Sequence, residues 1–368
     1  MGWLSGWTYR KKITISASTY PTTWQASTAY SKGAIVKPTT ANGYYYICTT
    51  AGTSGSSQPT WPTTVGATVN DNTVVWECDN RYPVLLAIGE SSGASNYNFH
   101  LEGRSASFPS SKDQSGDLRF TTGDGSTSLD FWVESVSGTS PNRTAFIWVE
   151  TLGDLSAKDI YCYFGNSGAS NASNGNNTFP FFDDFPGSTL DTNKWQGDTG
   201  YYSVANSICS ISTSADRNIT GTISLNFPLA VRAYAKFPSN KYNGFEGANS
   251  YITMFMGGPS SSSIRTDDAS GNHTFISNWT RDQYRTFEIR FRNTALNFLD
   301  NNTEVQNSPI TSYIFVEAKY ARIYAGNPGE SYVDWILLRR FVSPEPAFSS
   351  AGALETFNFG AMLLMFLS

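Results

Sequence analysis

Aromatic residues are the first candidates for binding chemistry in this chain, and many of them lie between residues 17 and 80. Trp24, Tyr45, Trp61 and Trp76 stand there among Thr, Gly, Pro and Ser residues. Flat aromatic rings can pack against the apolar faces of sugars, and Trp and Tyr add a polar group at the edge. We expect one or more of these rings to face solvent and bind glycan, with Trp61 as the strongest candidate. The alternative is a small aromatic core.

Three carboxylates form a second candidate site. Asp183 and Asp184 open the C-terminal half of the chain, and Asp334 lies near its end. If that half is a sandwich whose first and last strands are neighbours, these side chains come close together. Oxygen ligands of this kind suit a structural calcium ion. Ordinary turn or edge carboxylates are the alternative, and no other cofactor is expected.

The four cysteines include one candidate disulfide. Cys48 ends an aromatic strand and Cys78 follows Trp76 in another, so a bond between neighbouring strands is one expectation. No two cysteines are spaced as C-x-x-C, which removes the usual zinc and redox signatures.

Signatures of an enzyme are few. Ser91 lies in a Gly-x-Ser-x-Gly sequence, but the residues after it are poor helix formers, whereas a nucleophile elbow needs a helix there. Only two histidines are present, which leaves little choice of catalytic base. Glu246 and Glu288 remain conceivable members of a hydrolytic carboxylate pair. We therefore expect no enzymatic activity, with a glycoside hydrolase as the least favoured alternative.

The composition of the chain indicates the fold class that positions these residues. Of the 368 residues, 15% are charged and 15% are aromatic, and stretches rich in Ala, Leu, Glu and Lys are missing. This mixture favours short strands joined by turns and predicts an all-β protein. A net charge of −5 without a long basic run argues against a nucleic-acid partner.

Changes in residue pattern and composition along the chain indicate five parts. Tyr9, Lys11, Ile13 and Ile15 alternate with more polar residues, as in a half-buried strand, whereas residues 166–180 are almost entirely polar. We predict an N-terminal β-sandwich at residues 1–16 and 81–165, an inserted aromatic module at 17–80, a linker at 166–180, a second sandwich at 181–348, and a tail at 349–368.

The tail ends in a run of seven apolar residues at 361–367. A membrane span needs about 20 such residues, so this run is too short to cross a bilayer. One interpretation is that the tail packs on its own domain, and the other is that it is buried between subunits of a homo-oligomer or larger assembly. The residues assigned to assembly are Met362, Leu363, Leu364, Met365, Phe366 and Leu367.

Several motifs resemble known families. The opening Trp7-Thr-Tyr-Arg-Lys-Lys-Ile-Thr-Ile and the later Ile160-Tyr-Cys-Tyr-Phe-Gly-Asn resemble a β-sandwich family of unknown function found in archaeal, bacterial and viral surface proteins. Phe181-Phe-Asp-Asp-Phe and Tyr332-Val-Asp-Trp-Ile-Leu-Leu-Arg-Arg resemble the first and last strands of concanavalin-like, laminin-G-like jelly rolls. The insert is similar to the small polysaccharide-binding modules of chitinases, which also occur in phage tail proteins. The resemblance implies two sandwich domains and glycan binding.

Together these features predict a non-enzymatic structural and adhesive protein. No export signal is recognisable at the N-terminus, which runs from Met1 straight into a strand-like segment. We therefore expect display on a virion surface, as a tail fibre, decoration or coat-associated protein that contacts host glycans and other subunits. The alternative is a secreted or cell-surface polysaccharide-binding protein of a cellular organism.

Overall fold

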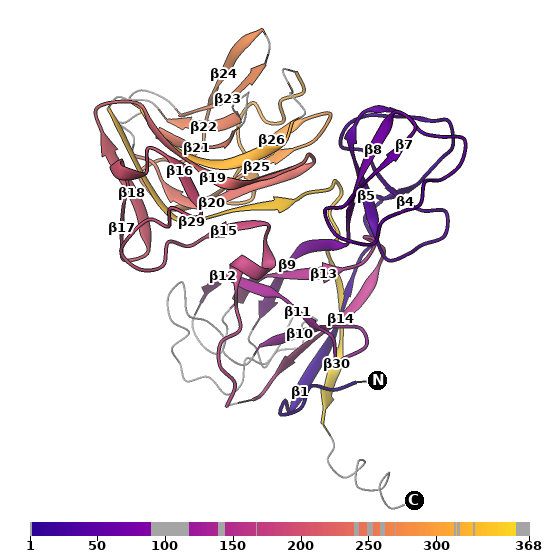
Figure 1. Ribbon diagram of the computed structural model, residues 1–368. Coiled ribbons are helices and arrows are strands. Elements are labelled where there is room, and N and C mark those ends of the chain that lie inside the picture. Colours follow the sequence, from indigo (N-terminus) through magenta and orange to yellow (C-terminus); the bar gives the residue numbers. More distant parts are fainter. Residues whose placement is uncertain are drawn as a thin grey trace, which may run out of the picture.

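A computed structural model describes residues 2–357 apart from 90–117, 139–143, 167, 239–242, 249–252, 258–261, 269, 313, 315–316 and 327. Ser91 and the assembly residues Met362–Leu367 lie outside these ranges. The chain is all-β, as predicted, and forms an N-terminal sandwich, a small insert module and a jelly roll (Figure 1).

The N-terminal sandwich consists of two antiparallel sheets. One sheet has the order β11 (Ser128–Leu129), β10 (Arg119–Thr122), β14 (Lys158–Phe164), β1 (Tyr9–Ile15) and β30 (Phe348–Thr356). The other has the order β12 (Phe131–Ser137), β13 (Thr144–Leu152) and β9 (Arg81–Gly89). Ile13 and Ile15 are fully buried on the inner face of β1, as the alternating sequence predicts.

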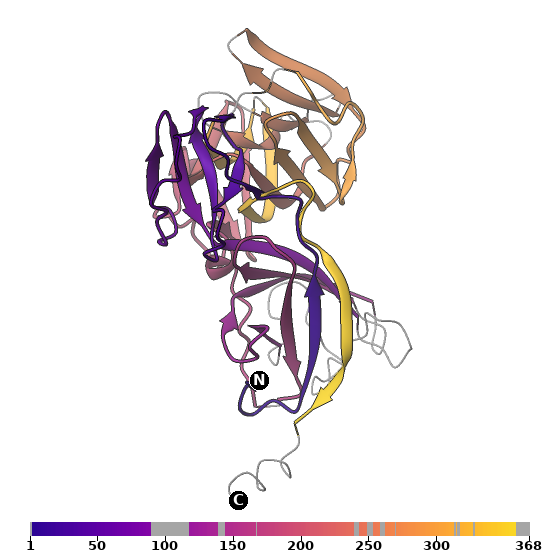
Figure 2. The same ribbon diagram turned by 90° about the vertical axis from the view of Figure 1, so that its right-hand side faces the viewer.

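Strand β30 belongs to the N-terminal sandwich, which corrects the expected start of the tail. It runs antiparallel to β1 and covers that edge of the sheet (Figure 2). Phe348 and Ala351 pack against the core of the N-terminal sandwich, and Glu355 forms an ion pair of 2.7 Å with Arg10. A strand added at an open sheet edge satisfies backbone groups that would otherwise remain unpaired. Residues 348–356 are therefore part of a domain and not of an assembly tail.

The insert module is built from seven short strands between β1 and β9. A five-stranded sheet has the order β2 (Thr22–Thr23), β4 (Ile35–Lys37), β5 (Tyr45–Thr50), β8 (Val74–Asp79) and β7 (Thr68–Asp71). Strands β3 (Ala29–Tyr30) and β6 (Gly52–Thr53) form a separate pair. The side chains of Ile35, Tyr45 and Ile47 belong to the core cluster of the N-terminal sandwich. The insert is therefore packed onto the domain that it interrupts.

The polar stretch between the two sandwiches is more ordered than its composition predicts. It contains the helix α1 (Gly175–Thr178), which the side chain of Asn174 caps by accepting from the backbone N–H of Asn177. Ser173 accepts from the N–H of Val133, and Phe179 packs beside Trp132 and Trp148. These contacts fasten the connection to the surface of β12 and β13.

The jelly roll contains two large antiparallel sheets. The first follows β17 (Ser203–Ala205), β18 (Ile208–Thr213), β29 (Gly329–Arg340), β20 (Leu229–Lys236), β25 (Arg285–Phe291), β26 (Leu296–Asp300) and β27 (Thr303–Glu304), with β15 (Phe181–Asp183) also paired to β29. The second follows β16 (Trp195–Gly197), β19 (Arg217–Leu225), β28 (Lys319–Ala325), β21 (Asn243–Ala248), β22 (Thr253–Gly257), β23 (Ser262–Asp268) and β24 (Gly271–Ser277). A core rich in Phe lies between them.

Candidate functional site

Three of the four aromatic residues predicted to bind glycan are core residues. Trp24, Tyr45 and Trp76 are 5%, 1% and 0% exposed. Asp71 on β7 accepts hydrogen bonds from both indoles, at 2.8 Å from Nε1 of Trp24 and 2.9 Å from Nε1 of Trp76. The Tyr45 hydroxyl donates to the carbonyl of Arg81. A stacking role for these three residues was therefore wrong, because the small module needs them to build its own core and its contact with the N-terminal sandwich.

Trp61 is different, because it is only partly enclosed: it packs against the core of the insert, with its ring edge-on to Trp76. The side chain is half-buried and packs on Tyr46, with the ring centroids 4.2 Å apart. Its Nε1 donates to Oε1 of Gln58 at 3.1 Å, and the same oxygen accepts from the backbone N–H of Thr39 at 2.9 Å. The Nε2 of Gln58 also donates to the hydroxyl of Thr39, so the ring is held in one orientation beside an amide and a hydroxyl, an arrangement that loses little conformational freedom when a ligand binds.

A buried ion-pair network joins the N-terminal sandwich to the jelly roll. Arg232 on β20 makes two hydrogen bonds of 2.8 and 3.0 Å to Glu134 on β12. A register shift in β12 between Val133 and Ser135 leaves Glu134 as an extra residue, which re-aims its side chain at the jelly roll. Trp148 Nε1 also donates to Glu134, at 2.7 Å.

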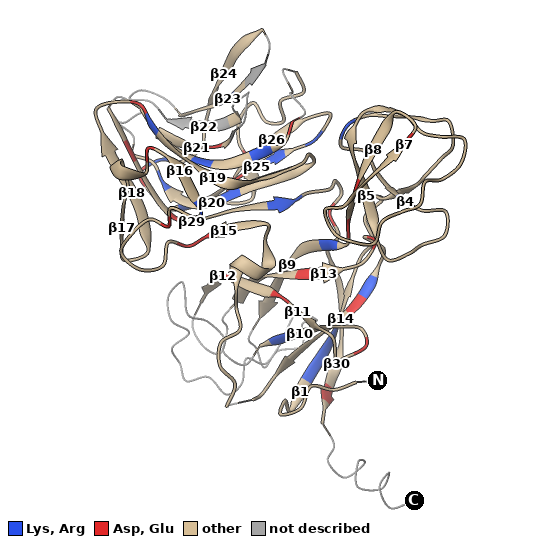
Figure 3. Cartoon of the chain, viewed as in Figure 1, with Lys and Arg blue, Asp and Glu red and all other residues tan. Residues whose placement is uncertain are grey.

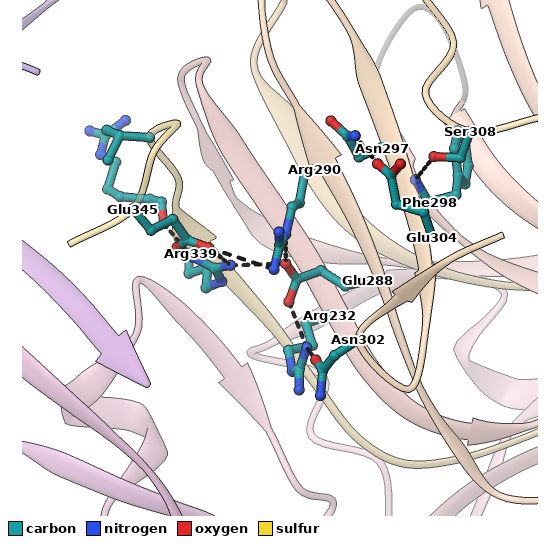
Figure 4. Close-up of polar contacts among 12 residues, drawn as sticks. Arg232, Glu288, Arg290, Asn297, Phe298, Asn302, Glu304, Ser308, Arg339 and Glu345 are labelled. Atoms are coloured by element: carbon teal, nitrogen blue, oxygen red, sulfur yellow. Dashed lines mark hydrogen bonds and ion pairs between the residues drawn. The ribbon is translucent and has the colours of Figure 1, made fainter. Parts of the chain in front are cut away.

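Glu288 on β25 stands at the centre of this network (Figure 4). It accepts from Arg232 at 2.8 Å and from Arg339 at 2.9 Å, and it also pairs with Arg290. Burial alone would raise the pKa of Glu288, but the guanidinium groups of Arg339, Arg290 and Arg232 outweigh it and lower that pKa. Glu288 is therefore held ionised as a structural counter-ion.

Aromatic packing surrounds the ion pairs on the same face. Trp132 lies 5.1 Å from Trp335 and 4.8 Å from Phe182, measured between ring centroids. These rings come from β12, β29 and β15, so they belong to both sandwiches. Well-packed apolar side chains around charged pairs keep water away from them, which strengthens the electrostatic attraction. The two sandwiches are thus joined by a buried contact that combines ion pairs with aromatic packing.

The insert is also fastened to the jelly roll. Arg340 at the end of β29 donates to Asp79 at 2.9 Å and pairs with Glu77, both on β8. Figure 3 shows the basic residues of β29 and β25 at this end of the jelly roll. The backbone at Gly33 approaches Phe227 so closely that an added Cβ would lie 2.7 Å from its ring. Each of the three modules thus contacts the other two.

A pocket of about 270 Å³ lies where the insert meets the jelly roll. Tyr20 and Ile35 line it from the insert side, and Arg292, Phe341 and Val342 line it from the other. Tyr20 is 39% exposed, whereas Phe341 and Val342 are buried. The pocket therefore combines an accessible aromatic ring, an apolar floor and a cation.

The predicted calcium site is not formed. Asp183 lies opposite Ile336 in the sheet and accepts from Nε1 of Trp195 at 2.6 Å, on the side facing the jelly-roll core. Asp334 lies at a register shift of β29, on the outer side of the sheet near Tyr284. The pKa of Tyr284 is raised to about 12, mainly by burial and secondly by the negative charge of Asp334. Within the described part of the chain, no three His, Cys, Asp or Glu side chains are grouped to hold a metal. Asp183 and Asp334 therefore lie on different sides of the sheet, and Asp184, which follows β15, does not join them in a three-ligand group.

The expected disulfide is also absent, since Cys48 and Cys78 are buried free thiols. Cys48 lies opposite Trp76, whereas Cys78 lies opposite Tyr46, so the two cysteines are diagonal neighbours two positions apart. Each Sγ contacts a carbonyl instead, that of Thr50 or Pro62, at 3.2 Å. Burial raises the pKa of both thiols to about 11.

The two carboxylates considered for hydrolysis lie on different sheets. Glu246 on β21 follows the core residue Phe245, and Glu288 on β25 follows the core residue Phe287, so both point away from the sandwich interior but on opposite sides. Glu246 is paired with Arg322. Carboxylates of a glycosidase must flank one bond at about 5–10 Å, which opposite faces of a sandwich do not allow.

Sequence reasoning missed the residues of the pocket. Tyr20 precedes Pro21 in what reads as a plain connection, and Arg292 precedes the turn residues Asn293 and Thr294. Nothing in either segment indicates that the two come together, because they are brought close only when the insert docks on the jelly roll. Among the residues described, no helix is long and apolar enough to span a membrane.

The fold and site thus define a class of all-β proteins with a sandwich, a jelly roll and a docked aromatic module. A family model described as a domain of unknown function, DUF2341, matches residues 114–198, from the later strands of the N-terminal sandwich to the start of the jelly roll. This match agrees with part of the resemblance drawn from the sequence. A search of curated proteins found no match.

Among solved structures, this chain is similar to several glycoside-hydrolase-like proteins. A β-1,3-glucanase from Mycobacterium marinum is 14% identical with a TM-score of 0.36, over 44% of this chain and 98% of that one. β-Agarase A, solved with oligoagarose, is 13% identical with a TM-score of 0.37, over 44% and 91%. An immunostimulatory antigen and pseudo β-1,3-glucanase of Mycobacterium tuberculosis is 14% identical with a TM-score of 0.35, over 44% and 98%.

Proposed function

We propose that this chain is a non-enzymatic structural and adhesive protein that binds glycans through the surface of its insert module. The observation that carries the proposal is the setting of Trp61, whose half-buried ring is fixed beside Gln58 and Thr39. An aromatic face with amide and hydroxyl groups at its edge matches the alternating apolar and polar surfaces of a sugar.

The arrangement of carboxylates supports a role without catalysis. Glu246 and Glu288 are each engaged by arginine and lie on opposite faces of the jelly roll. A general acid needs a raised pKa, whereas the pKa of Glu288 is lowered. The buried ion pairs instead serve to hold the modules in one orientation, which suits a protein that presents a surface.

Display on a virion surface, in a homo-oligomer, is the more specific form of the proposal. Its support is the apolar run at residues 361–367, whose sequence suits burial between subunits. Light scattering of a chain ending at Phe357 tests it, because β30 is then complete. Loss of the oligomer is the expected result, and an unchanged oligomer would remove the assembly role. Detection of the chain in purified particles by mass spectrometry tests the location.

Glycan binding is tested by substitution of Trp61. On a glycan array followed by titration, Trp61→Ala is expected to weaken binding at least tenfold, while Trp61→Phe keeps the flat ring and retains most of the affinity. Val65→Ala is the control, because Val65 is 37% exposed in the same module. Near-ultraviolet circular dichroism shows whether each variant keeps the insert folded. A folded Trp61→Ala protein that binds like the wild type would refute the assignment.

A further inference from the structure

The pocket between the insert and the jelly roll contains a cation whose charge has no acidic partner within the part of the chain that the structure describes. Among the residues described, every arginine of the two interdomain contacts pairs with a carboxylate: Arg232, Arg290 and Arg339 in the network, and Arg340 at the insert. Arg292, two residues beyond Arg290, forms no such pair within the described chain. Its one side-chain hydrogen bond there runs from Nη1 to the hydroxyl of Ser343, at 3.3 Å.

The guanidinium of Arg292 is also incompletely satisfied. Its Nε is buried and has no hydrogen-bond partner in the described structure. A buried donor without a partner is unfavourable, and the positive charge of Arg292 has no counter-ion among the described residues. Guanidinium groups bind carboxylates through two parallel hydrogen bonds, and Arg292 lines the pocket, so an anion bound there neutralises its charge.

The remaining walls restrict what kind of anion fits. Tyr20 offers an accessible ring, and the buried side chains of Phe341 and Ile35 provide an apolar surface. Asn293 and Thr294 are exposed at the rim, in the turn between β25 and β26. A bare inorganic anion makes no use of the ring or the apolar floor. A sugar that carries a carboxylate can contact all of these groups. Its apolar ring faces pack on the aromatic and apolar side chains, and its hydroxyls bind the amide of Asn293 and the hydroxyl of Thr294.

We propose that this pocket binds one acidic sugar unit, with its carboxylate on Arg292 and its ring against Tyr20. The volume of about 270 Å³ lies near the lower end of ligand pockets, roughly 300–1,000 Å³, and so admits a single unit of a longer chain. The inference rests on the proposed glycan-binding function and adds the substrate class. Because both modules contribute walls, the site exists only when the insert is docked.

Titration calorimetry with a galacturonic acid trisaccharide, its neutral galactose counterpart and inorganic phosphate tests the proposal on the full chain. The acidic trisaccharide is expected to bind at least tenfold more tightly than the neutral one. Arg292→Gln is expected to remove that preference, and Tyr20→Ala is expected to weaken binding of the acidic sugar at least threefold. Arg119→Gln, the same change on the N-terminal sandwich, is the control and keeps the preference.

The outcomes separate the two proposals. If acidic and neutral sugars bind equally and Arg292→Gln has no effect, the pocket assignment is overturned while glycan binding through Trp61 stands. If phosphate binds as tightly as the acidic sugar and Tyr20→Ala has no effect, the pocket is a small-anion site and the sugar assignment is overturned. If no glycan binds on a broad array, the proposed function itself fails.

Discussion

Replacement of Asp71 tests why the aromatic residues of the insert are buried. Its carboxylate accepts three hydrogen bonds: from Nε1 of Trp24, from Nε1 of Trp76 and from the backbone N–H of Gly55 at 2.7 Å. Asp71 itself is 3% exposed. Asp71→Ala leaves these donors without an acceptor, at about 1–3 kcal/mol each, and hence about 3–6 kcal/mol together after allowance for relaxation.

That loss is comparable with the whole stability of the module. A unit of about 60 residues is stabilised by about 3–9 kcal/mol, at 0.05–0.15 kcal/mol per residue. We therefore expect Asp71→Ala to unfold the insert locally while the jelly roll remains folded. Hydrogen exchange followed by mass spectrometry should show lost protection in β5 and β8, and unchanged protection in β20 and β29. Asp71→Asn keeps one oxygen acceptor, so its protection in β5 and β8 should lie between that of the wild type and that of Asp71→Ala.

The exposed neighbour Asn70 on the same strand supplies a control, since Asn70→Ala removes no buried acceptor. Equal protection of β5 and β8 in Asp71→Ala and in the wild type would show that the indoles do not depend on this carboxylate.

Three further predictions concern the charged groups between and within the modules. Glu288→Gln removes the buried negative charge that pairs with Arg232 and Arg339, so we expect the free energy of unfolding to fall by about 3–5 kcal/mol. Calorimetry should then show a melting temperature lower by on the order of 10 °C. Asp159→Asn, at the exposed pair with Lys12, is the control and should change the melting temperature little. Arg340→Met should weaken the contact between the insert and the jelly roll, seen as faster hydrogen exchange in β8 and at the end of β29, while Arg285→Met within the jelly roll should leave exchange there unchanged. Burial raises the pKa of Glu150 to about 7 despite the nearby Arg81. Between about pH 4.5 and 7 the folded state therefore binds more protons than the unfolded state. The folded state loses stability as the pH rises through that range. Glu150→Gln should therefore be more stable than the wild type at pH 8, by on the order of 2–3 kcal/mol, and equally stable at pH 4; equal melting temperatures at both pH values would contradict the raised pKa.

Strand periodicity made the fold class predictable, but it did not reveal the partner of the last strand. Ile13 and Ile15 alternate with polar residues, and this pattern requires one buried face. Residues 348–356 are mostly small or polar, so their sequence lacks that alternation. Their place depends on the open edge of β1, far away in the chain, and a local pattern cannot show an edge that needs covering.

The candidate sites were predictable only in residue type. The number of aromatic residues in the insert indicated an unusual surface or core, yet the choice between them depended on Asp71, which accepts from the indole of Trp76 on β8 and from that of Trp24 just after β2. Likewise, Arg292 and Tyr20 acquire a shared pocket only through docking of two modules. Contacts between distant segments decide such cases, and spacing along the chain does not contain them.

The central claim is that this protein binds glycan without altering it. The most direct measurement titrates the full chain with oligosaccharides chosen from a glycan array and then analyses the recovered ligand by mass spectrometry. We predict saturable binding and a ligand recovered at its original length. A shortened oligosaccharide would contradict the claim, as would the failure of every oligosaccharide to bind.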